Sequence, residues 1–362
     1  MDIIIKKKST SKIKSKPKDI SKLKKITNNY LNKVCLAKQD TNKKEAMYHF
    51  IHEQIDNYHN QKFDLRKLVS KYNKRFFIIE IIDNKLKQLT PRNGIRIDEI
   101  IILLQKVLKK YKVTNTILFI NLADGYYYKT NDIPVFNFSL PEGVPGMLFP
   151  EHDVINIRPN RNYNINILHN KIIKYNPKEI LNDIYFVGNN TTKNKSKIRE
   201  RLSYEKSPFH VDLSGTFTVD MWDYKHHKYL LDLPGFQPWS IRLKFLFSTQ
   251  RPIIRVSFYN SDYGEKNYWR LWYFYLLKPN CDYFQLTYDY DNEKPLNNEL
   301  YNKIKNDILA IYHYLEKNEN IYKKISENSL KVSQNITVDE SVSYLYNLIE
   351  TYTKQCSEKP IV

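Results

Sequence analysis

Cysteine is nearly absent from this sequence. Only Cys35, Cys281 and Cys356 occur among its 362 residues, and they are far apart, with no CxxC motif and no Cys/His ligand spacing. We therefore expect neither a disulfide framework nor a cysteine-based structural zinc site. Three scattered cysteines fit a reducing compartment.

Long apolar runs are also lacking. No stretch approaches the roughly 20 apolar residues of a transmembrane helix. The apolar run Ile3–Ile5 is too short for the hydrophobic region of a signal peptide. We therefore expect a cytoplasmic protein with no membrane span, at most peripheral to a membrane.

Glycine is scarce as well. The 8 glycines all lie between Gly94 and Gly264. A chain that avoids glycine keeps it where φ is positive or where another group approaches the backbone closely. Gly125, Gly188 and Gly235 each follow a predicted strand, and ligands of α/β proteins bind at the carboxyl ends of strands. These strand ends are candidate ligand loops, although each fits an ordinary turn equally well.

Acidic residues are outnumbered by basic ones. The sequence has 58 Lys and Arg against 39 Asp and Glu, a net charge of +19. Residues 1–30 contribute +8 of this charge, which leaves +11 for the rest of the chain. We interpret residues 1–35 as a flexible basic arm. A basic body suits nucleic acid, an acidic membrane surface or a phosphate-bearing small molecule, but lysine-rich codon usage explains the charge as well.

Helical and strand patterns alternate along the chain. In the first half, apolar spacing predicts helices over 43–58 and 97–111 and strands over 75–86, which ends in an Asp-Asn turn, and over 116–122. In the second half it predicts strands over 184–187, 229–233, 253–258 and 283–287, helices from about 196 and 240, a helix over 268–277, and helices from 297 nearly to the end. This alternation predicts an α/β protein with two facing Rossmann-like domains, 40–170 and 175–325, and C-terminal helices, 326–362, that cross back to the first.

One carboxylate is placed for acid–base chemistry. Asp124 follows the mostly apolar run Ile117–Leu122, with only Ala123 between them. A carboxylate at the end of a buried strand can be partly desolvated, which raises its pKa and suits it to act as a general base. An Asp before a Gly is also a common turn cap, so both interpretations stay open.

Two strand ends have the parts of a phosphate site. After the strand at 229–233 come Gly235, then Ser240 at a predicted helix start, then Arg242. Free N–H groups at the helix start attract anions, and an arginine can add a bidentate contact. After the strand at 184–187 comes Gly188, followed by a basic run that includes Arg199. A helix cap with a surface arginine, and a solvated basic face, are the structural alternatives; neither GxxxxGK[ST] nor GxGxxG occurs.

No metal site is expected from the sequence. His226 and His227 precede a strand, and adjacent strand residues face opposite sides, so they would not share a metal. Asp289 and Asp291 form a DxD-like pair beside Glu293, which we interpret as a polar loop.

Three blocks of the sequence resemble the capsule-associated and protein O-glucosyltransferase family (Rumi-like, KDEL-motif-containing). The first is NLADGYYYKTNDIPVFNFS with the later LFPEH, the second is IYFVGNNTTKNKSKIRERL, and the third is HHKYLLDLPGFQPWSIRLKFLFSTQRPIIRV with YWRLWYFYLLKP. They follow the order and approximate spacing of that family over roughly residues 117–330.

The resemblance implies a GT-B fold and a metal-independent, inverting transfer from a UDP-sugar to a hydroxyl of a protein or glycan acceptor. It implies that Asp124 is the general base. The residues that match the family's donor site are Gly188, Arg199, His226, Gly235, Ser240 and Arg242.

The sequence also departs from the family. Val187 stands where the family usually has an arginine, so Lys193, Lys195 or Arg255 would have to supply that charge. The proline usual shortly after the base, the signal peptide, the paired cysteines and the retention tail are missing. Two alternatives therefore remain: a catalytically inactive binding or structural protein with a GT-B fold, and a basic nucleic-acid-binding protein. The nucleic-acid interpretation lacks any RRM-like, OB-like or helix-turn-helix signature.

Overall fold

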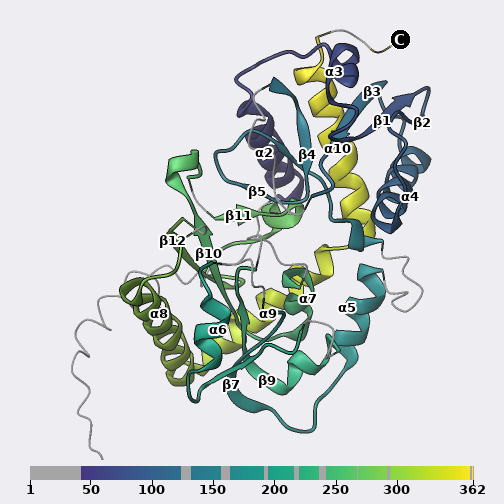
Figure 1. The fold of residues 1–362 in the computed structure, drawn as a ribbon. Helices are drawn as coiled ribbons and strands as arrows, with labels where there is room; N and C mark the ends of the chain where they lie inside the picture. Colours follow the sequence, from purple (N-terminus) through teal and green to yellow (C-terminus); the bar gives the residue numbers. More distant parts are fainter. Residues whose placement is uncertain are drawn as a thin grey trace, which may run out of the picture.

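A computed structural model of the chain describes residues 42–123, 132–155, 164–190, 195–215, 220–235, 242–266, 268–291, 294–358 and 361. The predicted basic arm, Asp124, Lys193 and Ser240 lie outside these ranges. The described chain builds two five-stranded sheets with helices around them (Figure 1).

The first sheet is mixed. Its strands are β1 (Phe77–Ile82), β2 (Lys85–Gln88), β3 (Thr116–Ile120), β4 (Val135–Asn137) and β6 (Met147–Leu148), in the order β2-β1-β3-β4-β6. Strand β1 is antiparallel to β2 and β3, whereas β3, β4 and β6 are parallel. The strand predicted over 75–86 is therefore a hairpin, because Asp83 and Asn84 both have positive φ and turn the chain.

Four helices surround this sheet: α2 (Lys43–Asp56), α3 (Leu65–Tyr72), α4 (Ile95–Lys110) and α10 (Val338–Cys356). The predictions of helices over 43–58 and 97–111 and of a buried strand over 116–122 are confirmed. Every residue of β3 is buried, since α10 packs beside it and Tyr352 donates a hydrogen bond to the Ile117 carbonyl at 2.8 Å.

The second sheet is wholly parallel. Its strands are β7 (Leu181–Val187), β8 (Phe209–Asp212), β9 (His227–Asp232), β10 (Ile253–Tyr259) and β12 (Phe284–Asp289). The spatial order is β12-β10-β9-β7-β8, the doubly wound arrangement in which the strand order reverses between the first and third strands, here β7 and β9. Side chains of β7 alternate between the two faces of the sheet: Ile184 and Phe186 belong to one hydrophobic core, and Tyr185 and Val187 belong to the other.

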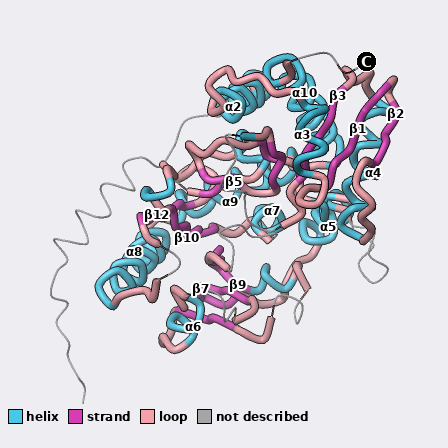
Figure 2. Tube along the Cα trace, turned by 45° about the horizontal axis from the view of Figure 1, so that its top comes forward, coloured by secondary structure: helices cyan, strands magenta, loops and turns pink. Residues whose placement is uncertain are grey.

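The helices around the second sheet are α5 (Ile165–Lys174), α6 (Ile198–Ser203), α7 (Leu243–Leu246), α8 (Asn298–Lys317) and α9 (Glu319–Asn335). Short 3-10 turns lie at η2 (His152–Val154), η3 (Asp223–His226), η4 (Phe247–Thr249), η5 (Ser261–Tyr263) and η6 (Trp272–Leu276). Figure 2 shows the strands of the two sheets as separate groups.

The predicted helix over 268–277 is wrong. The segment forms a short strand, β11 (Trp269–Arg270), and then η6. β11 pairs antiparallel with β5 (Leu140–Pro141), a link between the two halves of the chain. Aromatic residues lose side-chain freedom in a helix, and here the pairing and the burial of Trp272 and Tyr273 override the apolar spacing.

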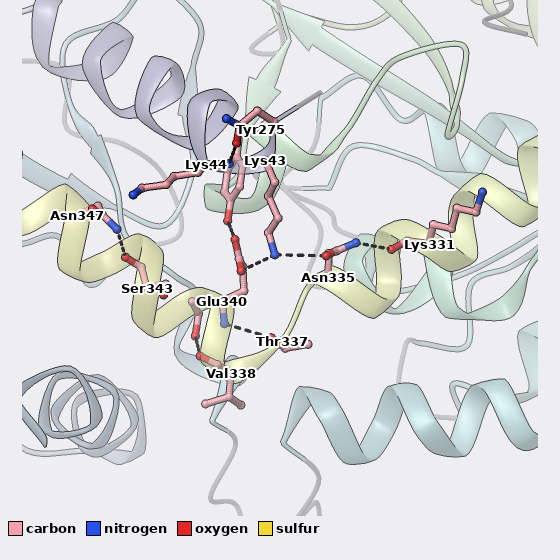
Figure 3. A network of polar contacts seen from close by, with 12 residues as sticks. Lys43, Lys44, Tyr275, Lys331, Asn335, Thr337, Val338, Glu340, Ser343 and Asn347 are labelled. Atoms are coloured by element: carbon pink, nitrogen blue, oxygen red, sulfur yellow. Dashed lines mark hydrogen bonds and ion pairs between the residues drawn. The ribbon is translucent and has the colours of Figure 1, made fainter. Parts of the chain in front are cut away.

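Helices α9 and α10 carry the chain from the second sheet back to the first. In α9, Ile321 and Ile325 belong to the core of the second sheet, and Val332 belongs to the core that reaches the first. Figure 3 shows the junction: Lys43 reaches Asn335 at 3.2 Å and Glu340 at 2.5 Å, which ties the start of α2 to the end of α9 and the start of α10.

The architecture is therefore α/β, as predicted, with one mixed and one parallel sheet. Across the described ranges, none of the helices has the length and apolar character needed to cross a membrane.

Candidate functional site

The carboxyl ends of β7 and β9 form the point at which the strand order of the second sheet reverses. Gly188 and Asn189 follow β7, and Leu233 to Gly235 follow β9. The connections that leave these two strands diverge, and such divergence opens the crevice in which doubly wound proteins bind their ligands. Two of the three glycine-marked strand ends therefore lie side by side.

Arg199 spans the two loops. Its Nη1 donates to the Asn189 carbonyl at 3.0 Å, and its Nη2 donates to the Leu233 carbonyl at 2.9 Å. The side chain is 8% exposed, and its Nε is buried without a hydrogen-bond partner among the described residues. Short helix α6 presents it from just beyond β7.

Arg242 reaches the same place from the connection after β9, directly before α7. Its guanidinium lies 4.4 Å from the centre of the Phe186 ring, and that of Arg199 lies 4.9 Å from the same ring. Arg242 donates to the Val187 carbonyl. A Cβ on Gly188 would lie 2.7 Å from Nη1 of Arg242, so a side chain there would displace the arginine. At Gly188 the interpretation that glycine permits a close approach is confirmed.

The electrostatics of this group favour an anion. Burial, and then the charge of Arg242, lower the pKa of Arg199 to about 9, while Asp232 acts in the opposite direction. Asp232 ends β9 and pairs with Arg255 at 3.4 Å. Its Oδ1 is buried with no hydrogen-bond partner in the described chain. Asp232 thus pairs with Arg255 and acts on Arg199, while Arg242 lies beside Arg199 on the Phe186 ring. This concentration of guanidinium groups favours a bound anion.

Arg255 lies on the same sheet face as Val187. Side chains alternate along β10, and its neighbours Ile254 and Val256 enter the core on the opposite face. Arg255 is 1% exposed and donates to the Trp269 carbonyl at 2.9 Å. The position at which the resembled family has an arginine is apolar here, and the guanidinium on that face comes from β10.

A buried ion triad lies two residues beyond Arg242 and was not predicted. Lys244 is completely buried and lies 2.9 Å from Asp153 and 3.6 Å from Glu151. Burial lowers the pKa of Lys244, but the two carboxylates more than offset this and the net shift is upward. The sequence feature that could have predicted a buried ion pair is the lysine inside the otherwise apolar run LKFLF. The triad joins the LFPEH segment to α7, so two of the three resemblance blocks are in contact.

The remaining predicted site residues are not all brought to this place. Gly235 is the last described residue before Arg242, and Ser240 lies outside the described ranges. His226 precedes β9 at its amino end, where the Tyr175 hydroxyl lies 2.6 Å from its Nε2. A strand rises about 3.3 Å per residue, so His226 is separated from Leu233 by roughly 20 Å. The structure therefore does not place His226 with the arginines.

The catalytic candidate Asp124 also lies outside the described residues. The last residue described before it is Ala123, just beyond the carboxyl end of β3. Here the Asn121 side chain donates a hydrogen bond to Asn137 at 3.0 Å and accepts one from the Ala123 N–H. Comparison with known proteins adds no identification: no family model and no curated protein matches this chain.

Proposed function

We propose that this protein is a glycosyltransferase that transfers a sugar from a UDP-sugar to a hydroxyl acceptor with inversion and without a metal at the donor. The supporting observation is the pair Arg199 and Arg242, which hold the same Phe186 ring at the switch point of a parallel sheet. In this proposal the two sheets belong to a GT-B-like fold and the donor lies at the second.

The arginine pair suits a diphosphate because two guanidinium groups meet on one buried ring. Burial first, and then the charge of Arg242, lower the pKa of Arg199, and a bound anion would offset both effects. A diphosphate neutralises both and adds charge-assisted hydrogen bonds. Together, the switch point and the paired cations distinguish this proposal from a solvated basic face.

The reaction would proceed in one displacement. Asp124 accepts the proton of the acceptor hydroxyl, and the hydroxyl oxygen attacks the anomeric carbon. The bond from that carbon to the diphosphate oxygen breaks, and UDP departs with the electron pair. Arg199 and Arg242 stabilise the charge that develops on the departing diphosphate, which is the part of the barrier that fixed cations lower most.

Calorimetric titration with UDP tests the donor site. Charge-assisted contacts contribute roughly 1.5–3 kcal/mol, so Arg242→Ala should weaken UDP binding by about one to two orders of magnitude. The matched control is Arg251→Ala. Arg251 also donates to a backbone carbonyl, that of Lys225 at 2.8 Å, but it lies just before β10, at the amino ends of the strands. Equal loss in both variants, or no loss in either, would refute the site.

A second candidate is a protein that binds the donor without turning it over. Val187, which replaces the arginine of the resembled family, favours it. A panel of UDP-sugars, incubated with and without EDTA, separates the two functions. An active transferase releases UDP slowly from one sugar donor even without acceptor, and EDTA leaves that rate unchanged; a binding protein releases none.

A further inference from the structure

Three side chains with metal-ligating chemistry meet at the amino end of the second sheet. Asp183 lies on β7, His210 on β8 and His227 starts β9. These strands are neighbours in the order β9-β7-β8. The pairing sets Tyr185 opposite His210, and an irregularity in the register lies between the Leu181–His227 pair and Ile184. The carboxylate of Asp183 contacts both imidazoles, and these contacts bring the three side chains together.

The oxygens of Asp183 already lie at the spacing of a coordination shell from both imidazole nitrogens. Nδ1 of His227 is 2.9 Å and 3.0 Å from the two oxygens of Asp183, and Nδ1 of His210 is 3.0 Å from Oδ2. The three atoms fall within 4.8 Å of one another. Neighbouring ligands bound at about 2.0–2.2 Å from one ion lie about 2.8–3.6 Å apart, from octahedral to tetrahedral geometry. Small movements would therefore admit an ion between them.

The surroundings hold the ligands in place and leave an entrance. His227 stacks on Tyr185 with ring centres 3.6 Å apart and planes 5° apart, which fixes the direction of its Nδ1. The His227 side chain is 9% exposed and that of Asp183 is 16% exposed, whereas that of His210 is 51% exposed. Water can thus reach the cluster from the His210 side and complete the coordination of an ion.

We propose that Asp183, His210 and His227 bind one divalent transition-metal ion, with water in its remaining positions. Two imidazoles and one carboxylate suit Zn²⁺ and its first-row neighbours rather than Ca²⁺ or Mg²⁺. The ion would clamp the starts of β7, β8 and β9. The ion would lie at the amino ends of the strands, whereas Arg242 lies at their carboxyl ends. It therefore takes no part in the proposed donor site and is independent of the proposed function.

Metal titration of the full chain tests this proposal. The protein is stripped with EDTA, exchanged into metal-free buffer and titrated with Co²⁺ while its visible absorption is recorded, then with Zn²⁺ as competitor. We expect one ion per chain and displacement of Co²⁺ by Zn²⁺. Loss of even an outer-shell partner typically costs 10–100-fold in affinity, so His210→Ala and Asp183→Asn should each weaken binding at least about tenfold.

The control addresses the other histidines near carboxylates. His49 and His52 line a surface cavity with Glu53 and Asp56 on α2, so His52→Gln should leave the affinity and stoichiometry unchanged. His210 is half exposed, and circular dichroism should show that His210→Ala still folds. Absence of a Co²⁺ absorption band, or equal binding by the parent, His210→Ala and Asp183→Asn proteins, would overturn the proposal and leave a purely hydrogen-bonded His–Asp–His cluster.

Discussion

Single residues decide whether the arginine pair can form. Gly188 leaves room for Arg242, and the ring of Phe186 gives both guanidinium groups a common surface. The site therefore depends on a missing side chain as much as on the charges.

Gly188→Ala should weaken UDP binding with only moderate loss of stability. The added Cβ would lie 2.7 Å from Nη1 of Arg242 and 2.8 Å from the Phe186 ring, and overpacking of this kind costs about 1–3 kcal/mol. Gly264→Ala is the control for UDP affinity: a Cβ there meets nothing within 4 Å, but φ is +78°, so this variant should lose some stability through backbone strain and keep the parental UDP affinity. Titration calorimetry and urea unfolding of both variants measure the two effects; a Gly188→Ala protein with parental UDP affinity would contradict the arrangement.

Asp124→Asn should abolish most of the transfer and leave donor binding intact. The amide keeps the size of the carboxyl group but cannot accept the acceptor proton, and a general base contributes about 10²–10⁴-fold to a rate. Initial rates of sugar transfer, measured beside UDP affinity and melting temperature, check this. Transfer at near the parental rate would rule out Asp124 as the base.

At the scale of elements, the sequence predicted regular patterns well and aromatic segments poorly. The helix at 43–58 and four of the five parallel strands of the second sheet follow from apolar spacing. The fifth, β8, was not predicted. The helix prediction for 268–277 was wrong because β11 pairs with β5, a strand about 130 residues earlier in the chain. No local pattern encodes that partner.

The same distinction applies to the candidate site. Gly188, Arg199 and Arg242 were predicted because each follows a strand end or opens a helix. Asp232–Arg255 and the Lys244 triad were not predicted as ion pairs, since their partners lie on other strands and segments. The Asp183 cluster was missed for a similar reason: the sequence suggested only the adjacent pair His226 and His227, whereas the structure joins three strands.

The packing of α5 against α7 predicts acid sensitivity. His169 is 5% exposed and meets Phe245 edge-on, and burial lowers its pKa from 6.5 to about 4. The unfolded chain therefore binds this proton first as pH falls, so stability is lost from about pH 6.5 down to about pH 4. At pH 5 the loss is about 2 kcal/mol relative to pH 7.5.

His169→Phe should remove this part of the pH dependence, because phenylalanine fills the space and binds no proton. Urea unfolding at pH 7.5 and pH 5 measures it. His313→Gln, at an exposed position on α8, should keep the parental difference between the two pH values. A parental difference in His169→Phe would show that other groups cause the acid sensitivity.

At the scale of the whole molecule, the first sheet depends on the last helix. Leu345, Leu348, Ile349 and Tyr352 of α10 are fully buried, and each such side chain contributes about 1.5–3 kcal/mol. Together they contribute about 6–12 kcal/mol, which is comparable to the roughly 5–15 kcal/mol by which a domain is stable.

Removing residues 338–362 should therefore unfold the first sheet and leave much of the second. Hydrogen exchange should become fast in β1 and β3, while β7 and β9 stay protected, and adding a peptide of residues 338–358 should restore protection. Deletion of residues 1–35 serves as the control and should change neither sheet. Protection of β3 in the shortened chain would show that α10 is dispensable.

The path of α9 and α10 also sets an order of events during biosynthesis. Ile120 ends β3 and Cys356 ends α10, so 356 − 120 = 236 residues must be translated after the strand before its covering helix is complete. At about 5–20 residues per second, a ribosome needs roughly 12–47 s for that distance. During this interval β3 is synthesised but α10 is not yet there to bury it. A chaperone that binds extended apolar segments therefore has time to bind this strand.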